Sequence, residues 1–281
     1  MSAAVPVAGS LAPDLIERVL TRLGLRARPD PTSLGGLAQV YGAWCREVPF
    51  DNVRKLIHLR RGGTGPLPGD EPRDFFEAWL RYGAGGTCWA GNGALQALLQ
   101  SLGFIARRGL GTMLVNPSMS PNHGTVVVEC EGGRYVVDAS ILHGEPLALE
   151  TGAATAVEHP AWGVRCTTRE GRWVIRWRPL HAPEGIECRI ERLQVNDFHE
   201  RHERTRPWSP FNYSVYARRN REDAVIGVAF GRRVEIGDEG VDIGEGLAAA
   251  ARARFLIEEL GLHEALVAQL PEDLSLPPPP G

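Results

Sequence analysis

The sequence lacks the paired cysteines that mark many zinc, redox and disulfide-rich proteins. Its 281 residues contain five cysteines, and no two of them form a Cys-x-x-Cys pair. The common zinc and redox spacings are therefore absent. An odd number of scattered cysteines fits free thiols in a reducing compartment, where one of them is available for chemistry.

A basic surplus and long apolar runs are also missing. The formal net charge is −3, so no positive field exists to hold nucleic acid or an anionic membrane. No apolar run approaches the roughly 18 residues that span a bilayer. The first ten residues, MSAAVPVAGS, have neither the basic start nor the apolar stretch of a signal peptide. We therefore expect a cytoplasmic protein that binds neither nucleic acid nor membrane.

The spacing of apolar residues changes along the chain. Up to residue 103 it is helical, and the expected helices cover 13–23, 34–44, 72–80 and 88–102. Beyond residue 104, β-branched or alternating segments predict strands over 125–130, 134–138, 172–178 and 187–195. The Ala/Gly-rich segment 151–163 is expected to be a loop. The pattern indicates helices first and strands next.

The last third of the sequence mixes both patterns. We expect helices over 197–205, 247–260 and 262–270, and a hairpin over 224–236 that turns at Gly231. The closing SLPPPPG has the composition of a disordered tail. Length and pattern together predict two or three compact units.

Cys88 is the candidate nucleophile. Thiol catalysis requires an ionised sulfur, a base within hydrogen-bonding reach and a third group that orients the base. Cys88 follows Gly85 and Gly86 and begins a predicted helix, where free N–H groups and the helix dipole favour a thiolate. The backbone N–H groups of Cys88 or Trp89 would then stabilise an oxyanion. The alternative is a structural cysteine, since free cysteines are often small buried hydrophobes.

His123 and Asp138 are the candidates for the base and the orienting group. They lie 15 residues apart, on either side of a predicted strand–turn–strand. A four-residue turn over 129–132 would place the two residues opposite each other. A two-residue turn at 132–133 would place Asp138 opposite Val127, about 13 Å from His123. A triad therefore requires the wider turn, a bulge, or His123 just outside its strand. Taken singly, the two residues also suit a surface histidine and a turn aspartate.

At these residues the sequence resembles the arylamine N-acetyltransferases. Their nucleophile lies in R-G-G-Y/F-C-F/W-E-x-N before a Leu-rich helix ending in L-G-F, and residues 84–104 read AGGTCWAGNGALQALLQSLGF. The family's I/V-P-F-E-N-L/I is similar to VPFDNV at 48–53, and its T-x-P-x-S-P-F to TRPWSPF at 205–211. Its His and Asp match His123 and Asp138. The similar blocks span residues 48 to 211.

The resemblance implies an α+β fold of the papain/transglutaminase-like kind. Its parts would be a helical domain over 1–104 with the nucleophile, a β-barrel-like domain over 105–205 with His and Asp, and an α/β lid over 206–281. Cys88 would take an acetyl group from acetyl-CoA, and an arylamine or hydrazine would then attack the thioester. His123 would move protons, and Asp138 would hold the imidazole. Phe50, Trp89 and Phe211 would line the amine pocket, and no metal is implied.

The sequence departs from the family motif at several positions. Ala84 and Ala90 replace the motif's Arg and Glu, and Ala139 to Leu142 replace a Gly-rich stretch that lies near the acyl donor in relatives. Three other functions therefore stay open. They are an amide synthase that takes its acyl group from a carrier-protein thioester, a cysteine hydrolase or transglutaminase with the same triad, and an inactive homologue that acts as a scaffold.

His199 and His202 are the one metal-like pair in the pattern. Spaced i and i+3, they can share a helix face, but no third ligand is evident in the sequence. A solvated charged helix is the favoured interpretation.

Overall fold

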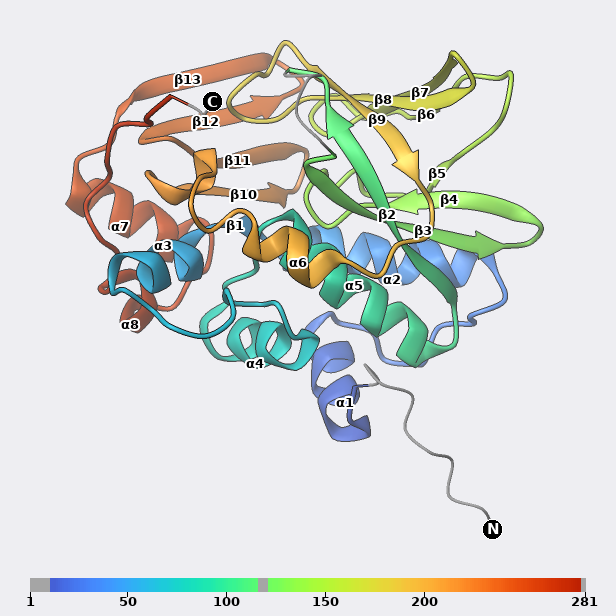
Figure 1. The fold of residues 1–281 in the computed structure, drawn as a ribbon, viewed down its shortest axis with the longest axis horizontal. Helices are drawn as coiled ribbons and strands as arrows, with labels where there is room; N and C mark the ends of the chain where they lie inside the picture. Colours follow the sequence, from blue (N-terminus) through green and yellow to red (C-terminus); the bar gives the residue numbers. More distant parts are fainter. Residues whose placement is uncertain (1–10, 116–120, 279–281) are drawn as a thin grey trace.

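The computed structural model describes residues 11–115 and 121–278, and its first part is helical (Figure 1). The helices are α1 (Pro13–Arg22), α2 (Leu34–Glu47), α3 (Val53–Arg60), α4 (Pro72–Tyr82) and α5 (Cys88–Leu102). α5 ends at Gly103, a C-cap glycine in the left-handed conformation with φ 104°. α5 packs between α4 and the strands that follow, and most of its residues are buried, although Gln100 near its end is exposed. The sequence pattern missed α3.

An eight-stranded antiparallel sheet follows. Its strands are β2 (Ile105–Met113), β3 (His123–Cys130), β4 (Gly133–Val137), β5 (Leu147–Ala148), β6 (Thr155–Val157), β7 (Val164–Arg169), β8 (Arg172–Trp177) and β9 (Ile186–Arg192), in the order β5-β4-β3-β2-β9-β8-β7-β6. The two edge strands meet, because the Thr155 hydroxyl donates to the Ala148 carbonyl at 2.5 Å. The sheet is thus a nearly closed barrel around an apolar interior. β6 lies inside the segment 151–163 that was expected to be a loop.

The last part forms a second sheet with helices on it. Its strands are β1 (Phe50–Asp51), β10 (Tyr216–Arg221), β11 (Ala224–Ala229), β12 (Arg232–Gly237) and β13 (Gly240–Gly246), in the order β1-β10-β11-β12-β13. β11 and β12 form the hairpin expected to turn at Gly231. α6 (Phe198–Glu203) precedes this sheet, and α7 (Ala249–Glu258) and α8 (Glu264–Val267) follow it. These elements confirm the predicted α+β class, with helices first, a barrel next and a mixed end.

β1 links the two ends of the chain. Although it lies among the first helices in sequence, it pairs with β10, and Phe50 lies opposite Arg218 in the register. The sheet of the last part therefore includes a strand from the first. The domain boundaries at 104/105 and 205/206 stay a prediction.

The β3–β4 hairpin has neither of the two registers considered from sequence. Cys130 pairs with Gly133, so the turn is Glu131–Gly132, with φ of 48° and 75°. Both turn residues are left-handed, as in a type I′ hairpin. The expectation of a wider turn, a bulge or a His123 outside its strand was therefore wrong. His123 is the first residue of β3 and Asp138 lies one residue beyond β4, and their side chains still meet.

The segment after α8 is partly fixed to the protein. The Leu274 N–H donates to the Tyr213 carbonyl at 2.8 Å, and the Trp208 indole donates to the Pro277 carbonyl at 3.3 Å. These contacts contradict a disordered tail as far as residue 277, while 279–281 lie outside the described residues. None of the helices in the described ranges has the length and apolar character needed to cross a bilayer.

Candidate active site

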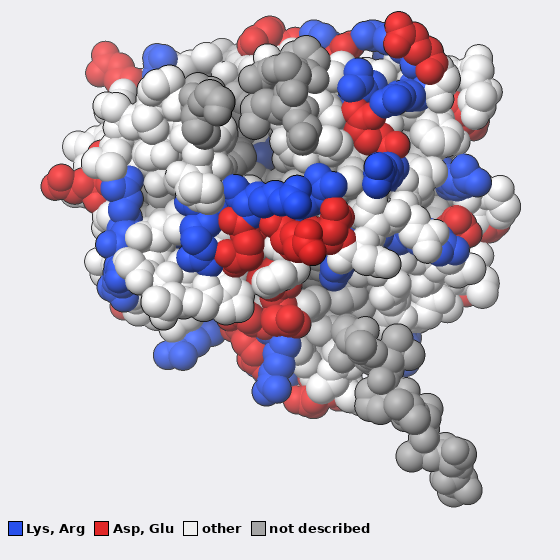
Figure 2. All heavy atoms as spheres, in the orientation of Figure 1, with Lys and Arg blue, Asp and Glu red and all other residues white. Residues whose placement is uncertain are grey.

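A cavity of about 600 Å³ lies where the first helices, the barrel and the segment around α6 meet. Among its lining residues are Cys88 and His123, together with the three predicted pocket aromatics, Phe50, Trp89 and Phe211. Phe50 and Phe211 contact each other edge to face, with their ring centroids 5.4 Å apart. The face drawn in Figure 2 is hollowed beside α6, and its positive and negative side chains are interspersed. The structure therefore brings five of the six sequence candidates to one cavity, and the sixth, Asp138, is not among its lining residues.

The loop before Cys88 is held by a buried carboxylate. Asp51 accepts the Gly85 N–H at 2.6 Å and the Val53 N–H at 3.0 Å, so it joins this loop to the start of α3. Burial raises the pKa of Asp51 to about 6, against the opposing effect of these hydrogen bonds. A side chain at Gly85 would put its Cβ 1.9 Å from the Pro49 carbonyl oxygen. Only glycine fits there.

Cys88 begins α5, as predicted. The first backbone N–H of this helix with an acceptor one turn earlier is that of Gly91, which donates to the Thr87 carbonyl at 2.8 Å. The backbone N–H groups of Cys88 and Trp89 precede it and have no helical acceptor. Thr87 is the N-cap residue, but its side chain accepts no capping hydrogen bond. Two free amide donors therefore lie beside the sulfur.

His123 and Asp138 form a buried pair. The distance between His123 Nε2 and Asp138 Oδ2 is 2.7 Å, and both residues are buried. The Cys88 side chain lies within hydrogen-bonding reach of the same imidazole. Because Nε2 is occupied by Asp138, Nδ1 is the ring nitrogen left for the sulfur. The three side chains thus lie next to one another in the order Cys88, His123 and Asp138.

Charge within this series shifts the two pKa values in opposite directions. Burial works to lower the pKa of His123, but the adjacent Asp138 carboxylate, with Cys88, raises it well above its ordinary value. Burial works to raise the pKa of Asp138, but the imidazole and the N–H of Ser140 hold it well below its ordinary range. Both shifts favour the charged form of the pair, an imidazolium beside a carboxylate. An imidazolium stabilises a neighbouring thiolate.

The Asp138 carboxylate is fixed by its other oxygen. Oδ1 accepts the N–H groups of Ser140 at 2.8 Å and Ile141 at 3.1 Å. The Tyr41 hydroxyl donates to the Asp138 carbonyl at 2.9 Å and accepts its N–H at 3.0 Å. These bonds leave Oδ2 directed at His123 and hold the segment just beyond β4 in place.

Asn92 is a positioning residue that sequence reasoning left without a role. Its side chain donates to the Gly124 carbonyl at 2.6 Å and accepts the Ala139 N–H at 2.9 Å. It therefore ties α5 to the residues next to both His123 and Asp138. It follows Cys88 by four residues, one helical turn, which was the signal that could have found it.

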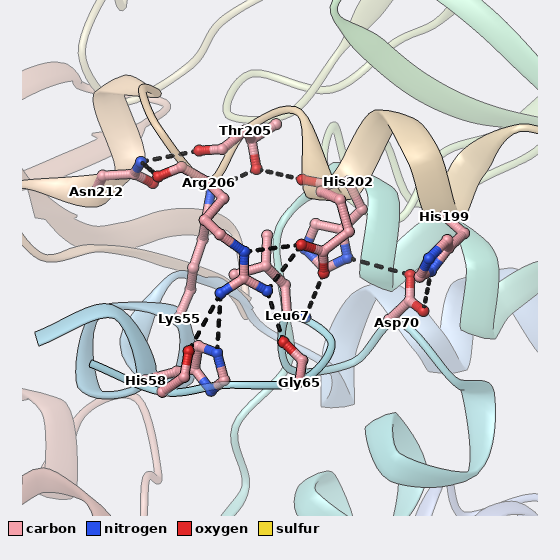
Figure 3. Close-up of polar contacts among 12 residues, drawn as sticks. Lys55, His58, Gly65, Leu67, Asp70, His199, His202, Thr205, Arg206 and Asn212 are labelled. Carbon is pink, nitrogen blue, oxygen red and sulfur yellow. Dashed lines mark hydrogen bonds and ion pairs between the residues drawn. The ribbon is translucent and has the colours of Figure 1, made fainter. Parts of the chain in front are cut away.

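Lys55 is a further cavity residue that sequence reasoning missed. It is the only lysine in the chain, and its side chain is buried beside the cavity that Cys88 lines. Its Nζ donates to the Thr205 hydroxyl at 2.7 Å (Figure 3). Burial lowers the pKa of Lys55 to about 7, although Cys88 and Glu203 act in the opposite direction.

The segment that carries Thr205 is itself held by polar contacts (Figure 3). Asp70 lies 2.5 Å from His199 Nδ1 and 3.7 Å from His202 Nδ1. Glu203 accepts the Leu67 N–H at 2.6 Å, and Arg206 donates to the Gly65 carbonyl at 2.7 Å. The His199–His202 pair thus joins α6 to the loop before α4.

We predict that Lys55 titrates near pH 7 and that its burial destabilises the fold below that pH. A lysine pKa lowered in the folded state means that the unfolded chain binds more protons between about pH 7 and pH 10.5. The stability of the wild type should therefore rise with pH across this window. Lys55→Met should be more stable than the wild type by on the order of a few kcal/mol at pH 6, with the difference vanishing toward pH 10.

Two measurements check this prediction. Because the chain has one lysine, protein labelled with ¹³C-lysine gives a single side-chain Nζ-linked methylene signal, whose titration midpoint reports the pKa directly. Urea unfolding at several pH values gives the stability difference, and the signal of the urea-unfolded chain serves as the control. A folded-state midpoint near 10 would refute the prediction.

Comparisons with known proteins agree with this architecture. A family model described as N-acetyltransferase matches residues 33–235. The arylamine N-acetyltransferase of Mycolicibacterium smegmatis is 30% identical over 162 residues, 54% of this chain and 55% of that protein. That of Mycobacterium tuberculosis H37Rv is 27% identical over 148 residues, 49% of this chain and 50% of that protein. The chain thus matches about half the length of these curated relatives.

Solved structures are similar over a longer stretch. The M. smegmatis arylamine N-acetyltransferase superimposes with a TM-score of 0.75 at 21% identity, covering 95% of this chain and 98% of that one. The Mycobacterium marinum enzyme in complex with CoA gives a TM-score of 0.76 at 20% identity, covering 91% and 98%. At this identity the similarity establishes the fold. With the family model covering most of the sequence, the chain belongs to the N-acetyltransferase family.

Proposed function

We propose that the chain is an acyltransferase that moves an acetyl group from acetyl-CoA to an arylamine or hydrazine through a Cys88 thioester. The observation that carries the proposal is the hydrogen-bonded His123–Asp138 pair beside Cys88, with Cys88 and His123 lining one cavity. The M. marinum relative solved with CoA supports a CoA thioester as the donor. Phe50, Trp89 and Phe211 supply apolar walls suited to an aromatic amine.

In the first half-reaction, the Cys88 sulfur attacks the thioester carbonyl and forms a tetrahedral intermediate. The free N–H groups at the start of α5 can stabilise the negative oxygen of this intermediate. The carbon–sulfur bond to CoA then breaks, and the CoA thiolate takes a proton from the His123 imidazolium. Cys88 is left acetylated, and His123 is neutral.

In the second half-reaction, the nitrogen of the amine attacks the acetyl carbonyl on Cys88. His123 now accepts the proton that the amine loses, and the Cys88 thiolate leaves as the new amide bond forms. Asp138 holds the imidazole in the tautomer that presents its lone pair to the reacting groups. Together, the two half-reactions return Cys88 and His123 to the charge states in which they started.

The proposal is tested by mixing the full chain with acetyl-CoA and measuring the intact mass. We expect one acetyl group on Cys88, which an arylamine removes faster than water does. Removal by water alone would indicate a hydrolase. Acylation by a carrier-protein thioester but not by acetyl-CoA would indicate an amide synthase. No acylation from either donor would refute the proposal and favour the inactive homologue.

A further inference from the structure

Arg218 is a buried cation in the wall of the cavity. It lies in β10, opposite Phe50 of β1, and only 1% of its surface is exposed. Along this strand, Tyr216 and Arg218 both line the cavity that contains Cys88, whereas Arg219 does not. Alternation of side chains along the strand explains the difference, since Arg219 points to the other face of the sheet.

The hydrogen-bonding capacity of Arg218 is mostly unused. A guanidinium group has five N–H donors and no acceptor. Nη2 makes a long contact of 3.4 Å with the Asn220 side-chain oxygen. Neither Nε nor Nη1 has a hydrogen-bond partner among the described residues. The guanidinium carbon lies 5.6 Å from the centre of the Trp177 ring, and this cation–π contact stabilises the charge on one face.

The protein supplies no carboxylate to this guanidinium. No Asp or Glu of the described ranges forms an ion pair with Arg218, and the undescribed segments contain no Asp or Glu. Asp138 is close enough to interact with Arg218 electrostatically, but its two oxygens are occupied by His123 and by backbone N–H groups. A buried, unpaired charge with free donors is among the most unfavourable arrangements in a folded protein.

The rest of the cavity wall has the same sign. Lys55, Arg201 and Arg204 also line it, and none of its described lining residues is Asp or Glu. Arg201 is paired with Asp197 at 2.8 Å, and Arg204 is largely exposed. Lys55 is also buried but donates to the Thr205 hydroxyl at 2.7 Å, so Arg218 is the buried cation of this wall with two donor nitrogens that have no partner among the described residues. A planar guanidinium fork of this kind matches the two oxygens of a carboxylate.

We propose that Arg218 binds a carboxylate of the substrate, so that the site takes a small acid and not only neutral amines and acetyl groups. The acid group belongs either to the amine, as in an aminobenzoate, or to the acyl chain, as in a short dicarboxylic thioester. A cavity of about 600 Å³ accommodates either molecule. The reacting amine or thioester in this statement rests on the proposed function, whereas the binding of a carboxylate does not.

The first experiment measures binding without chemistry. Benzoate and benzamide have the same shape and differ in charge, and neither is acylated at a ring amine. We expect benzoate to raise the melting temperature of the full-length protein more than benzamide does. Arg218→Met should weaken benzoate binding by about tenfold to a hundredfold, the range expected for lost charge-assisted hydrogen bonds. Arg219→Met, which removes the same charge on the opposite face of β10, is the matched control and should keep wild-type affinity.

The second experiment identifies which substrate carries the acid. The ratio of kcat/KM for 4-aminobenzoate to that for aniline tests the amine, and the ratio for succinyl-CoA to that for acetyl-CoA tests the acyl chain. Arg218→Met should lower one of these ratios by about tenfold to a hundredfold. If the variant folds poorly, Arg218→Gln, which removes the charge but keeps a polar side-chain end, replaces it in both experiments.

The outcomes separate the two proposals. Benzoate binding that equals benzamide binding, or that survives Arg218→Met, overturns the carboxylate site. So does a set of ratios that Arg218→Met leaves unchanged in an active enzyme. If Cys88 is never acylated but benzoate binding depends on Arg218, the proposed function fails and the carboxylate site stands.

Discussion

Replacing Cys88 with alanine is expected to abolish acyl transfer, with a loss of at least about 10⁴-fold in kcat/KM. Among the described residues that line the cavity, Cys88 is the one cysteine, so no second thiol can form the thioester. The variant should keep its fold, because alanine is well tolerated at the start of a helix and Cys88 is only partly buried. Transfer from acetyl-CoA to an arylamine, with intact mass after the first half-reaction, measures the effect.

The matched control is Cys130→Ala. Cys130 lies at the end of β3, its thiol contacts the Thr32 carbonyl at 3.5 Å, and it does not line the cavity. This variant should keep acyl transfer within about twofold of the wild type. A small substitution in the core that does not touch the cavity affects the stability of the fold and not the reaction. A Cys88→Ala protein that still becomes acetylated and passes the group to an amine would remove Cys88 from the mechanism.

Replacing Asp138 with asparagine is expected to reduce kcat by about 10³- to 10⁴-fold. The reason lies in how the carboxylate is held. Oδ1 accepts the N–H groups of Ser140 and Ile141, so the single oxygen of an asparagine must occupy that position. Its NH₂ group then faces His123 Nε2 as a donor. The imidazole must accept at Nε2 and carry its proton on Nδ1, which leaves no lone pair for the reacting proton.

Asp51→Asn is the matched control for Asp138→Asn. Asp51 is also a buried aspartate that accepts two backbone N–H groups, but it does not contact His123. Its loss should affect stability and reduce kcat far less. Nitrogen-detected NMR of the imidazole reads the tautomer in each variant. Near-normal turnover in Asp138→Asn, or equal losses in the two variants, would contradict the role assigned to Asp138.

The sequence was most informative where local chemistry determines structure. Gly85, Gly86 and Cys88 indicated a glycine-rich loop that leads into a helix start, and the structure has that arrangement. The His123–Asp138 spacing identified the right pair, but neither expected register was right. The turn uses Glu131 at positive φ, and the Glu131 carboxylate accepts the Leu34 N–H at 2.8 Å. The two residues of this hydrogen bond are 97 positions apart in the sequence. Because a distant residue helps to fix the turn, the local sequence pattern could not predict the register.

Lys55 and Arg218 were missed for a related reason. Arg218 lies in a run that reads Arg-Arg-Asn-Arg, which is typical of a solvated strand. Its strand is buried because β1, far away in sequence, pairs with its open edge. Lys55 lies in the first turn of a short helix that the apolar pattern did not predict. In both cases burial, and not residue type, gives the side chain its significance, and burial depends on long-range packing.

The pairing of β1 with β10 has a consequence for how the chain can be cut. Cys88, His123 and Asp138 all precede residue 140, so a truncated protein could retain the full triad in its sequence. However, the strand that lies opposite Phe50 is made only after residue 215. A premature stop anywhere upstream of it would remove one wall of the cavity and leave the edge of β1 unpaired. Two separately produced fragments, split between α6 and β10, would regain the site only by re-forming that strand pair and the apolar contacts between α3 and the last part of the chain.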